Sequence, residues 1–290
     1  MQDGQRLDSN TNDSLNRQIT SDISADDRLR SQYMLNIINE GNRNIPISND
    51  LAIPHVLVQF WDDAVTIPSD IQKCIDSWKP LEEHGFERFL FDDERARQFI
   101  EKNFNSRYLD AFRRCRHPAM RSDYFRLCFI MVNGGFYVDA DDVYEGVNFE
   151  PCFYDDKLKL QPLCYNSLTD SMIKIPDFMT KPRDLQKLTF YVNNNPIIAP
   201  SNHPVIHMAL ERSTQILLAQ MVDDKQDVQS TTGPGNLTIC LVRHTIETER
   251  NSMPRDFMLL TDWDEVSVSR WPLDYRQDKR NWRLWDGHNV

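Results

Sequence analysis

Residues 121–142 hold the groups best suited to chemistry in this sequence. A short apolar run at 136–138 has the pattern of a buried strand, and three carboxylates follow it directly. Carboxylates at the end of a strand suit Mg²⁺ or Mn²⁺, which take oxygen ligands and often share them with substrate phosphates. The stretch therefore predicts a site for a metal and a diphosphate, with a nucleotide-sugar as the leading ligand. The three carboxylates are Asp139, Asp141 and Asp142.

Upstream of the strand, Asp123 and Arg126 stand three residues apart in a helical pattern that ends at Gly134-Gly135. This spacing places both side chains on one helix face. An exposed ion pair is the plain alternative, and such pairs contribute little. The functional interpretation is that Asp123 accepts hydrogen bonds from sugar hydroxyls while Arg126 faces sugar or phosphate oxygens.

Composition limits the class of protein. The chain has 290 residues, of which 40% are hydrophobic and 27% charged, as expected of a globular protein. A net charge of −11 argues against a nucleic-acid partner. No apolar run reaches the roughly 18–20 residues of a membrane span, and no signal peptide is evident. The six scattered cysteines favour a reducing compartment. We expect a cytoplasmic location, or a Golgi lumen if an anchor was removed.

The chain divides into three parts by composition. Residues 1–23 are polar and predicted to be disordered, and 24–52 are predicted to form a helix, opening at Ser24, with a linker. This helix is expected either to pack on the main domain or to mark a partner surface. From 53 to 290 we expect one catalytic domain. Strands and helices alternate in its first half, which predicts an α/β fold with the ligand beyond the carboxyl ends of the strands. The expected strands are 56–61, 86–91 and 136–138, and the expected helices are 70–78, 94–104, 108–114 and 118–132.

The second half is less regular. Residues 193–196, Asn-Asn-Asn-Pro, indicate a turn before a strand at 197–199, and 203–221 indicate a helix. Gly233-Pro234-Gly235 is interpreted as a turn that lets the backbone approach a donor. The tail from 271 to 290 is dense in Trp, Tyr and Arg. Its aromatic side chains serve either as core or as a platform for an acceptor sugar.

The motifs Ser-Asp-x-x-Arg at 122–126 and Gly-Gly-x-Tyr-x-Asp-x-Asp at 134–141 resemble glycosyltransferases with an Asp-x-Asp sugar-binding region. These include fungal initiating α-1,6-mannosyltransferases and bacterial capsular transferases, and more distantly the clostridial glucosylating toxins. The run 53–61, Ile-Pro-His-Val-Leu-Val-Gln-Phe-Trp, resembles the opening strand of that family. The resemblance covers about residues 53–245 and is strongest at 121–142.

The resemblance implies a GT-A, Rossmann-like fold with a largely helical N-terminal extension, a nucleotide-sugar donor, Mn²⁺ or Mg²⁺, and retention of anomeric configuration. Many family members have His where this chain has Val58. The residues implied in donor binding are Val58, Trp61, which would stack on the base, Ser122, Asp123 and Arg126, which would hold the sugar, Asp139 at ribose or sugar, Asn195 and Gly233. Asp141 would bind the metal, with Asp139 beside it.

A remaining metal ligand is expected from the C-terminal part of such enzymes. His288 is the first candidate and His244 the second, whereas His203 and His207 fit packing roles at a helix. Asp142 is interpreted either as a partner behind the ligands or as an exposed side chain.

The function that follows is a metal-dependent retaining glycosyltransferase that moves a hexose from a nucleotide-sugar to a glycan, glycolipid or protein. A UDP-sugar is favoured and GDP-mannose stays open. The alternative is a non-catalytic carbohydrate- or nucleotide-binding module that kept the fold. A phosphohydrolase with two metals is disfavoured, because the sequence lacks the clustered His and Asp ligands that it needs.

Overall fold

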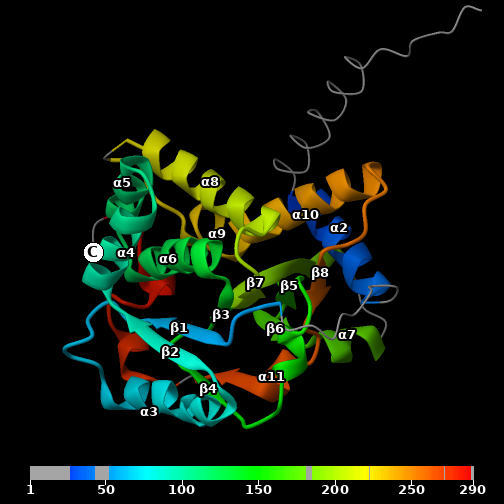
Figure 1. The fold of residues 1–290 in the computed structure, drawn as a ribbon. Coiled ribbons are helices and arrows are strands. Elements are labelled where there is room, and N and C mark those ends of the chain that lie inside the picture. Colours follow the sequence, from blue (N-terminus) through cyan, green and yellow to red (C-terminus); the bar gives the residue numbers. More distant parts are fainter. Residues whose placement is uncertain (1–26, 43–51, 181–184, 222, 271, 289–290) are drawn as a thin grey trace, which may run out of the picture.

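The computed structural model of the protein describes residues 27–42, 52–180, 185–221, 223–270 and 272–288. A seven-stranded mixed sheet runs through these ranges in the order β2-β1-β3-β7-β5-β6, with β8 paired to β5. Helices lie on both sides of the sheet (Figure 1). The expected disorder of residues 1–23 and the helix start at Ser24 fall outside the described residues.

The parallel half of the sheet positions the sequence motifs. β1 (Val56–Phe60) lies between β2 (Glu87–Phe91) and β3 (Gly135–Tyr137) and is parallel to both. Because parallel strands end at the same edge, Trp61 after β1 and Asp139 after β3 emerge side by side. The predicted α/β fold is confirmed, and so are these three strands.

The antiparallel half completes the sheet. β7 (Leu188–Ala199) runs antiparallel to β3 and to β5 (Leu158–Asn166). The far edge of β5 pairs with two short strands, β6 (Ser171–Ile173) and β8 (Phe257–Leu259). A separate two-stranded sheet joins β4 (Asp142–Tyr144) to β9 (Ser267–Ser269) and so fixes the chain directly after the carboxylates.

The turn expected at residues 193–196 is wrong, because β7 continues through it. Leu160 of β5 pairs with Ile197 of β7, and Pro162 of β5 pairs with Val192 of β7. Between these two pairs β7 has more residues than β5, and the extra residues form a bulge. The Asn195–Pro196 peptide bond in this bulge is cis. A bulge re-aims side chains, and here Asn194 and Asn195 turn toward the motif carboxylates while Asn193 donates to Gln161.

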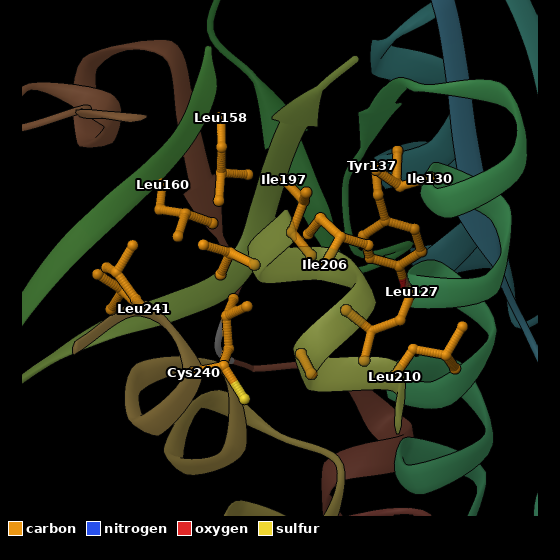
Figure 2. Packing of buried hydrophobic residues seen from close by; sticks show 14 of the residues in the cluster. Leu127, Ile130, Tyr137, Leu158, Leu160, Ile197, Ile206, Leu210, Cys240 and Leu241 are labelled. Atoms are coloured by element: carbon orange, nitrogen blue, oxygen red, sulfur yellow. The ribbon is translucent and has the colours of Figure 1, made fainter. Parts of the chain in front are cut away.

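One face of the sheet is covered by the main helical layer, which shares a single apolar core with the strands. Figure 2 shows part of this core, where Tyr137, Ile197 and Leu160 of the strands meet Leu127, Ile206 and Leu241 of the helices. The predicted packing of the N-terminal helix on the domain is confirmed, since its Met34 and Ile37 are buried in that core. The helices are α2 (Asp27–Glu40), α4 (Asp93–Asn103), α5 (Ser106–Arg114), α6 (Pro118–Asn133), α8 (Pro204–Ala219) and α10 (Pro234–Arg250).

The other face carries a smaller, aromatic-rich core in which Trp78, Phe136 and Phe149 are buried. Tyr144 of β4 and Trp263 and Val266 of α11 (Trp263–Val266) pack in this core, whereas α3 (Ser69–Ser77) packs in a third cluster with Trp61. Short elements complete the described chain: α7 (Ile175–Thr180), α9 (Val228–Thr231) and the 3₁₀ turns Lys79–His84, Glu150–Phe153, Leu185–Lys187, Asp274–Gln277 and Trp282–Leu284.

The sequence interpretation of Gly233-Pro234-Gly235 as a turn is also wrong. Gly233 is the N-cap of α10 and Pro234 is its first residue. Proline fits the first helical position, where its missing N–H and its fixed φ cost nothing. The long helix α10 therefore starts where a loop was expected.

All six cysteines are free thiols, and five of them are buried, as expected of core residues. Among the helices in the described ranges, none combines the length and the apolar character that a bilayer crossing requires.

Candidate active site

A cavity of about 580 Å³ opens at the carboxyl ends of β1 and β3, beside the bulge of β7. This volume lies within the range of about 300–1,000 Å³ that small-molecule sites occupy. The cavity brings together predicted site residues from distant parts of the chain. They are Trp61, Ser122, Asp123, Arg126, Asp139, Asp141 and Asn195.

Arg126 of α6 is the buried cation of the site, with a side chain only 3% exposed. Its Nη2 donates to Asp139 Oδ1 at 2.8 Å, and its Nη1 donates to the carbonyl oxygen of Asn194 at 2.6 Å. The guanidinium also lies 4.1 Å from the ring centroid of Tyr137. Arg126 therefore links the helix, the end of β3 and the bulge of β7. Asp139 keeps 32% of its side chain exposed, so it can still reach a ligand.

Ser122 supports this arrangement from one turn earlier in α6. Its Oγ lies 2.7 Å from the Tyr137 hydroxyl and accepts from Arg126 Nη2 at 3.1 Å. The side chain is buried at the wall of the cavity. The structure thus gives Ser122 a definite positioning role for Arg126.

Asp123 is buried in a shell of hydrogen-bond donors. Asn194 Nδ2 lies 2.8 Å from its Oδ1, and Thr232 Oγ1 lies 3.2 Å from its Oδ2. Burial raises the pKa of Asp123 to about 6, although the nearby Arg126 lowers it. A Cβ at Gly233 would come within 2.9 Å of the Val228 carbonyl oxygen. Gly233 is therefore needed for the tight approach of α9 and α10, and it lies behind Asp123 instead of in the cavity wall.

Asp141 is engaged by the C-terminal part of the chain. Its Oδ2 accepts a hydrogen bond from the Tyr275 hydroxyl at 2.6 Å and forms an ion pair with Arg276. Both charged side chains are largely buried, at 13% exposure for Asp141 and 11% for Arg276. Burial raises the pKa of Asp141, and the negative charge of Asp139 raises it further.

Asp142 is buried, so the expectation that its side chain is exposed is wrong. Its Oδ2 accepts from Asn195 Nδ2 at 2.9 Å and from Ser267 Oγ at 3.3 Å, while its Oδ1 has no hydrogen-bond partner in the described ranges. Burial, with the charges of Asp141 and Asp139, raises the pKa of Asp142 to about 8. Asn195 also accepts the backbone N–H of Asp139 at 3.0 Å, so this one amide orients two of the three carboxylates.

Asp139, Asp141 and Asp142 line the same cavity, and Asp142 has a buried carboxylate oxygen without a hydrogen-bond partner in the described ranges, so one or two carboxylate ligands are available to a divalent cation. Burial raises the pKa values of Asp141 and Asp142, and the negative charges of the neighbouring carboxylates raise them further. Mg²⁺ and Mn²⁺ commonly bind through one or two carboxylates, with water and substrate phosphate as further ligands. No ready group of three or more His, Cys, Asp or Glu ligands is found among the described residues.

Trp61, which was expected to stack on a base, follows β1 and lines the cavity, but it is buried and packs in a small apolar cluster. The tail segment, residues 272–288, packs against the Trp61 side chain. The Tyr275 ring meets Trp61 edge-on at 5.4 Å, and the Arg280 guanidinium lies 5.5 Å from the indole centroid.

Besides Gly233, three predicted residues lie outside the cavity. Val58 is fully buried in β1 and packs in the main core, so its side chain cannot reach a ligand there. His288 is an exposed tail residue whose backbone N–H donates to Asp286, and it is not part of the cavity wall. His244 lies on α10, with its Nε2 2.8 Å from the carboxylate of Asp256. The structure therefore does not bring His288 or His244 to the motif carboxylates.

Other lining residues were missed by the sequence analysis. Tyr275, Arg276 and Arg280 were noted only as part of an aromatic and basic tail, because nothing local links them to Asp141. The half of the cavity away from α6 is formed by β5, β6 and the region before β9. Its polar lining residues are Gln161, Lys174, Asn193 and Asp264.

Comparison with known proteins agrees with the motif. Residues 68–147 match the family described as glycosyltransferase sugar-binding region containing DXD motif. The matched range includes Ser122, Asp123, Arg126, Asp139 and Asp141, so the predicted resemblance to glycosyltransferases with an Asp-x-Asp region is confirmed there.

Two relatives extend the comparison. An uncharacterised glycosyltransferase of Acanthamoeba polyphaga mimivirus is 29% identical over 92 residues, which are 31% of this chain. The match spans only 36% of that relative's length. The PaToxG glycosyltransferase structure aligns over 84% of this chain and 83% of its own, with 14% identity and a TM-score of 0.44.

Proposed function

We propose that the protein is a metal-dependent retaining glycosyltransferase that moves a hexose from a nucleotide-sugar to a hydroxyl group. The observation that carries the proposal is one cavity in which Asp123, Arg126, Asp139 and Asp141 converge with Trp61 in its wall. These side chains come from β1, α6 and the end of β3, and they provide separate contacts for a base, a sugar and a metal-bound diphosphate.

On the donor side, each group has a chemical task. Asp123 and Asp139 accept hydrogen bonds from sugar or ribose hydroxyls, while Arg126 holds both carboxylates in place and presents positive charge. Asp141 provides a carboxylate oxygen for Mn²⁺ or Mg²⁺, and Asp142 and Asn195 fix the turn that presents it. Trp61 provides the aromatic face for the base, for which we favour uracil.

The expected chemistry follows from charge. Breaking the bond between the anomeric carbon and the diphosphate leaves negative charge on the phosphate and positive character on the sugar. A bound divalent cation stabilises the first charge when it is present. Arginine side chains aimed at the diphosphate act in the same direction, and they do so best in a site that excludes water. Same-face substitution, in which the leaving phosphate accepts the acceptor proton, then gives retention.

The acceptor fits the opposite half of the cavity. Asp264 accepts from Gln161 Nε2 at 2.8 Å and lies 3.5 Å from Lys174 Nζ, so a polar set is already ordered there. The apolar side chains of Ile173 and Ile175 line the same half. We propose that this half binds a glycan, glycolipid or protein acceptor and that the six free thiols reflect a reducing, cytoplasmic setting.

The test is calorimetric titration of UDP, GDP, UDP-glucose, UDP-galactose and GDP-mannose, each with Mn²⁺ and with EDTA. We expect one nucleotide to bind only with the metal, and Asp141→Ala to abolish that binding. Asp156→Ala is the matched control, because Asp156 is 82% exposed and lies outside the cavity wall. Absence of binding by folded wild type would contradict the proposal. Binding without any sugar transfer or donor hydrolysis would favour the non-catalytic module.

A further inference from the structure

The tail segment places cations on two of the proposed donor contacts. Arg276 pairs with Asp141, the proposed metal ligand, and Arg280 lies over Trp61, the proposed base platform. Both arginines line the cavity. A chain with a net charge of −11 therefore brings positive charge to the points where a metal and a nucleotide are expected.

The Arg276–Asp141 pair is placed to compensate a buried negative cluster. Desolvation and the neighbouring Asp139 disfavour the ionised form of Asp141, whereas the guanidinium stabilises it. A buried ion that loses its partner is strongly destabilised, so this carboxylate needs a cation at all times. A divalent cation that binds Asp141 Oδ2 would compete with the guanidinium that pairs with this oxygen.

The tail is attached on both sides of Arg276, so the arginine can move while the backbone stays. On one side Leu273 is buried, and the backbone N–H of Asp274 donates to Asp70 Oδ2 at 2.9 Å. On the other side the carbonyl oxygen of Lys279 lies 3.0 Å from His117 Nε2. A rotation of the Arg276 side chain is then enough to release Asp141 within the cavity.

We infer that Arg276 is an exchangeable counter-ion: it neutralises Asp141 before the metal binds and then moves to the diphosphate of the donor. The inference rests on the proposed function, in which Asp141 binds the metal. Guanidinium groups pair with phosphate oxygens in a bidentate manner that an ammonium group cannot reproduce. Arg276 is thus a positioning residue for Asp141 in one state and a donor-binding residue in the other.

The exchange predicts opposite effects on two ligands. Removing Arg276 frees Asp141 from a competitor, so Mn²⁺ alone should bind more tightly. If the pair is formed about nine-tenths of the time, the gain is about tenfold. Removing Arg276 also takes away a diphosphate contact, so pyrophosphate in the presence of saturating Mn²⁺ should bind about tenfold more weakly or worse.

The experiment measures both affinities on the full chain. Mn²⁺ binding is followed by the electron paramagnetic resonance signal of free Mn²⁺, and pyrophosphate binding by calorimetry. The variants are Arg276→Gln and Arg276→Lys, with Lys279→Gln as the matched control. Lys279 is an exposed cation of the same segment, and its side chain does not line the cavity. In Arg276→Gln we expect tighter binding of Mn²⁺ and weaker binding of pyrophosphate. In Lys279→Gln we expect both affinities to change by less than about twofold.

Each result decides the question. Equal Mn²⁺ affinity in Arg276→Gln and wild type, or unchanged pyrophosphate affinity, overturns the exchange. An equal gain in Mn²⁺ affinity in Lys279→Gln also overturns it, because the effect is then general charge. If Arg276→Gln does not fold, Arg276→Lys carries the test: it keeps the charge, so Mn²⁺ affinity should stay near wild type while pyrophosphate binding weakens. The proposed function and the exchange can fail separately. If no nucleotide binds while the Mn²⁺ and pyrophosphate effects are still observed, the proposed function is contradicted and the exchange is not.

Discussion

The imidazole of His117 joins helix α6 to the carbonyl oxygen of Lys279 in the tail segment. Its Nδ1 accepts the backbone N–H of Ala119 at 3.0 Å and so caps the helix, while Nε2 lies 3.0 Å from the Lys279 oxygen. Since Nδ1 accepts, Nε2 must carry the proton and donate it. One neutral ring therefore orders the helix that carries Arg126 and holds the segment that carries Arg276.

His117→Asn should separate these two roles. Asparagine is a good N-cap, so the start of α6 is kept, but its shorter side chain cannot also reach the Lys279 carbonyl. We expect the free energy of unfolding to fall by about 1 kcal/mol, the typical value of one hydrogen bond. The tail segment should exchange its amide hydrogens and be cleaved by trypsin faster than in wild type.

The matched control is His207→Asn, on the exposed side of α8. Hydrogen exchange measured by mass spectrometry would resolve the tail from α6. Unchanged protection of residues 272–288 in His117→Asn would show that the Lys279 contact does not hold the segment.

Two histidines that are held neutral in the folded state should each contribute a loss of stability as the pH is lowered below about 6.5, opposite in sign to the contribution of Asp142. Burial lowers the pKa of His117 and of His203, each from 6.5. His203 caps α8 in the same way, with Nδ1 accepting from Val205 and Nε2 facing the Asp256 carbonyl oxygen. Between the folded and unfolded pKa values the unfolded chain binds more protons, so acid favours unfolding.

The slope is bounded at about 1.4 kcal/mol per pH unit for each histidine. Urea unfolding at pH 7.5, 6.5 and 5.5 measures it, and the double variant His117→Asn/His203→Asn should flatten the dependence in this range. An equally steep loss in the double variant would assign the acid sensitivity to other groups.

Asp142→Asn should stabilise the protein above neutral pH and weaken Mn²⁺ binding at the proposed metal site. The pKa of Asp142 is raised to about 8 by burial and by Asp141 and Asp139. A carboxyl whose folded pKa is raised loses stability as the pH rises from its unfolded value of 3.8 toward 8, because the unfolded chain releases its proton first. An amide avoids this cost and still accepts from Asn195 and Ser267.

We expect a gain on the order of 2 kcal/mol at pH 8, within the range seen when buried charges are replaced. Thermal unfolding with and without Mn²⁺ measures both effects, and the stabilisation by Mn²⁺ should shrink in the variant. The control is Asp156→Asn, whose exposed carboxylate should leave both quantities unchanged. A loss of stability at pH 8 in Asp142→Asn would contradict the raised pKa.

The first half of the fold follows from local pattern, and the site motif with it. The strands at 56–60 and 135–137 are short apolar runs between helices, and their burial fits their place inside the sheet, with 87–91 beside them as the edge strand. Asp139, Asp141, Asp123 and Arg126 could be proposed as one site because a single helix and the strand after it carry all four.

The rest depends on contacts that no local pattern records. Asn-Asn-Asn-Pro has the composition of a turn, yet β7 keeps it within the sheet as a bulge because β5 pairs with β7 on both sides of it and β3 pairs with β7 directly after it. Pro234 was a helix-start signal that the flanking glycines obscured. Tyr275 and Arg276 meet Asp141 from 134 and 135 residues away, so only the folded chain shows that the tail reaches the motif.

Asp264→Asn should impair acceptor use while leaving donor binding intact. Asp264 lies in the half of the cavity away from α6, with its Oδ1 held by Gln161 Nε2 at 2.8 Å and 41% of its side chain exposed to a ligand. The amide keeps the shape and still accepts from Gln161, but it loses the charge that strengthens a hydrogen bond from an acceptor hydroxyl. We expect kcat/KM for the acceptor to fall about tenfold, with a smaller change in donor hydrolysis.

The measurement compares transfer to a panel of methyl glycosides with hydrolysis of the same donor in water. Glu265→Gln is the control, because Glu265 is the exposed neighbour of Asp264 and does not line the cavity. An equal loss of transfer and of hydrolysis in Asp264→Asn would place this carboxylate in the donor half. An acceptor defect with hydrolysis preserved would instead assign the two halves of the cavity to two substrates, since only one of the two reactions uses the acceptor.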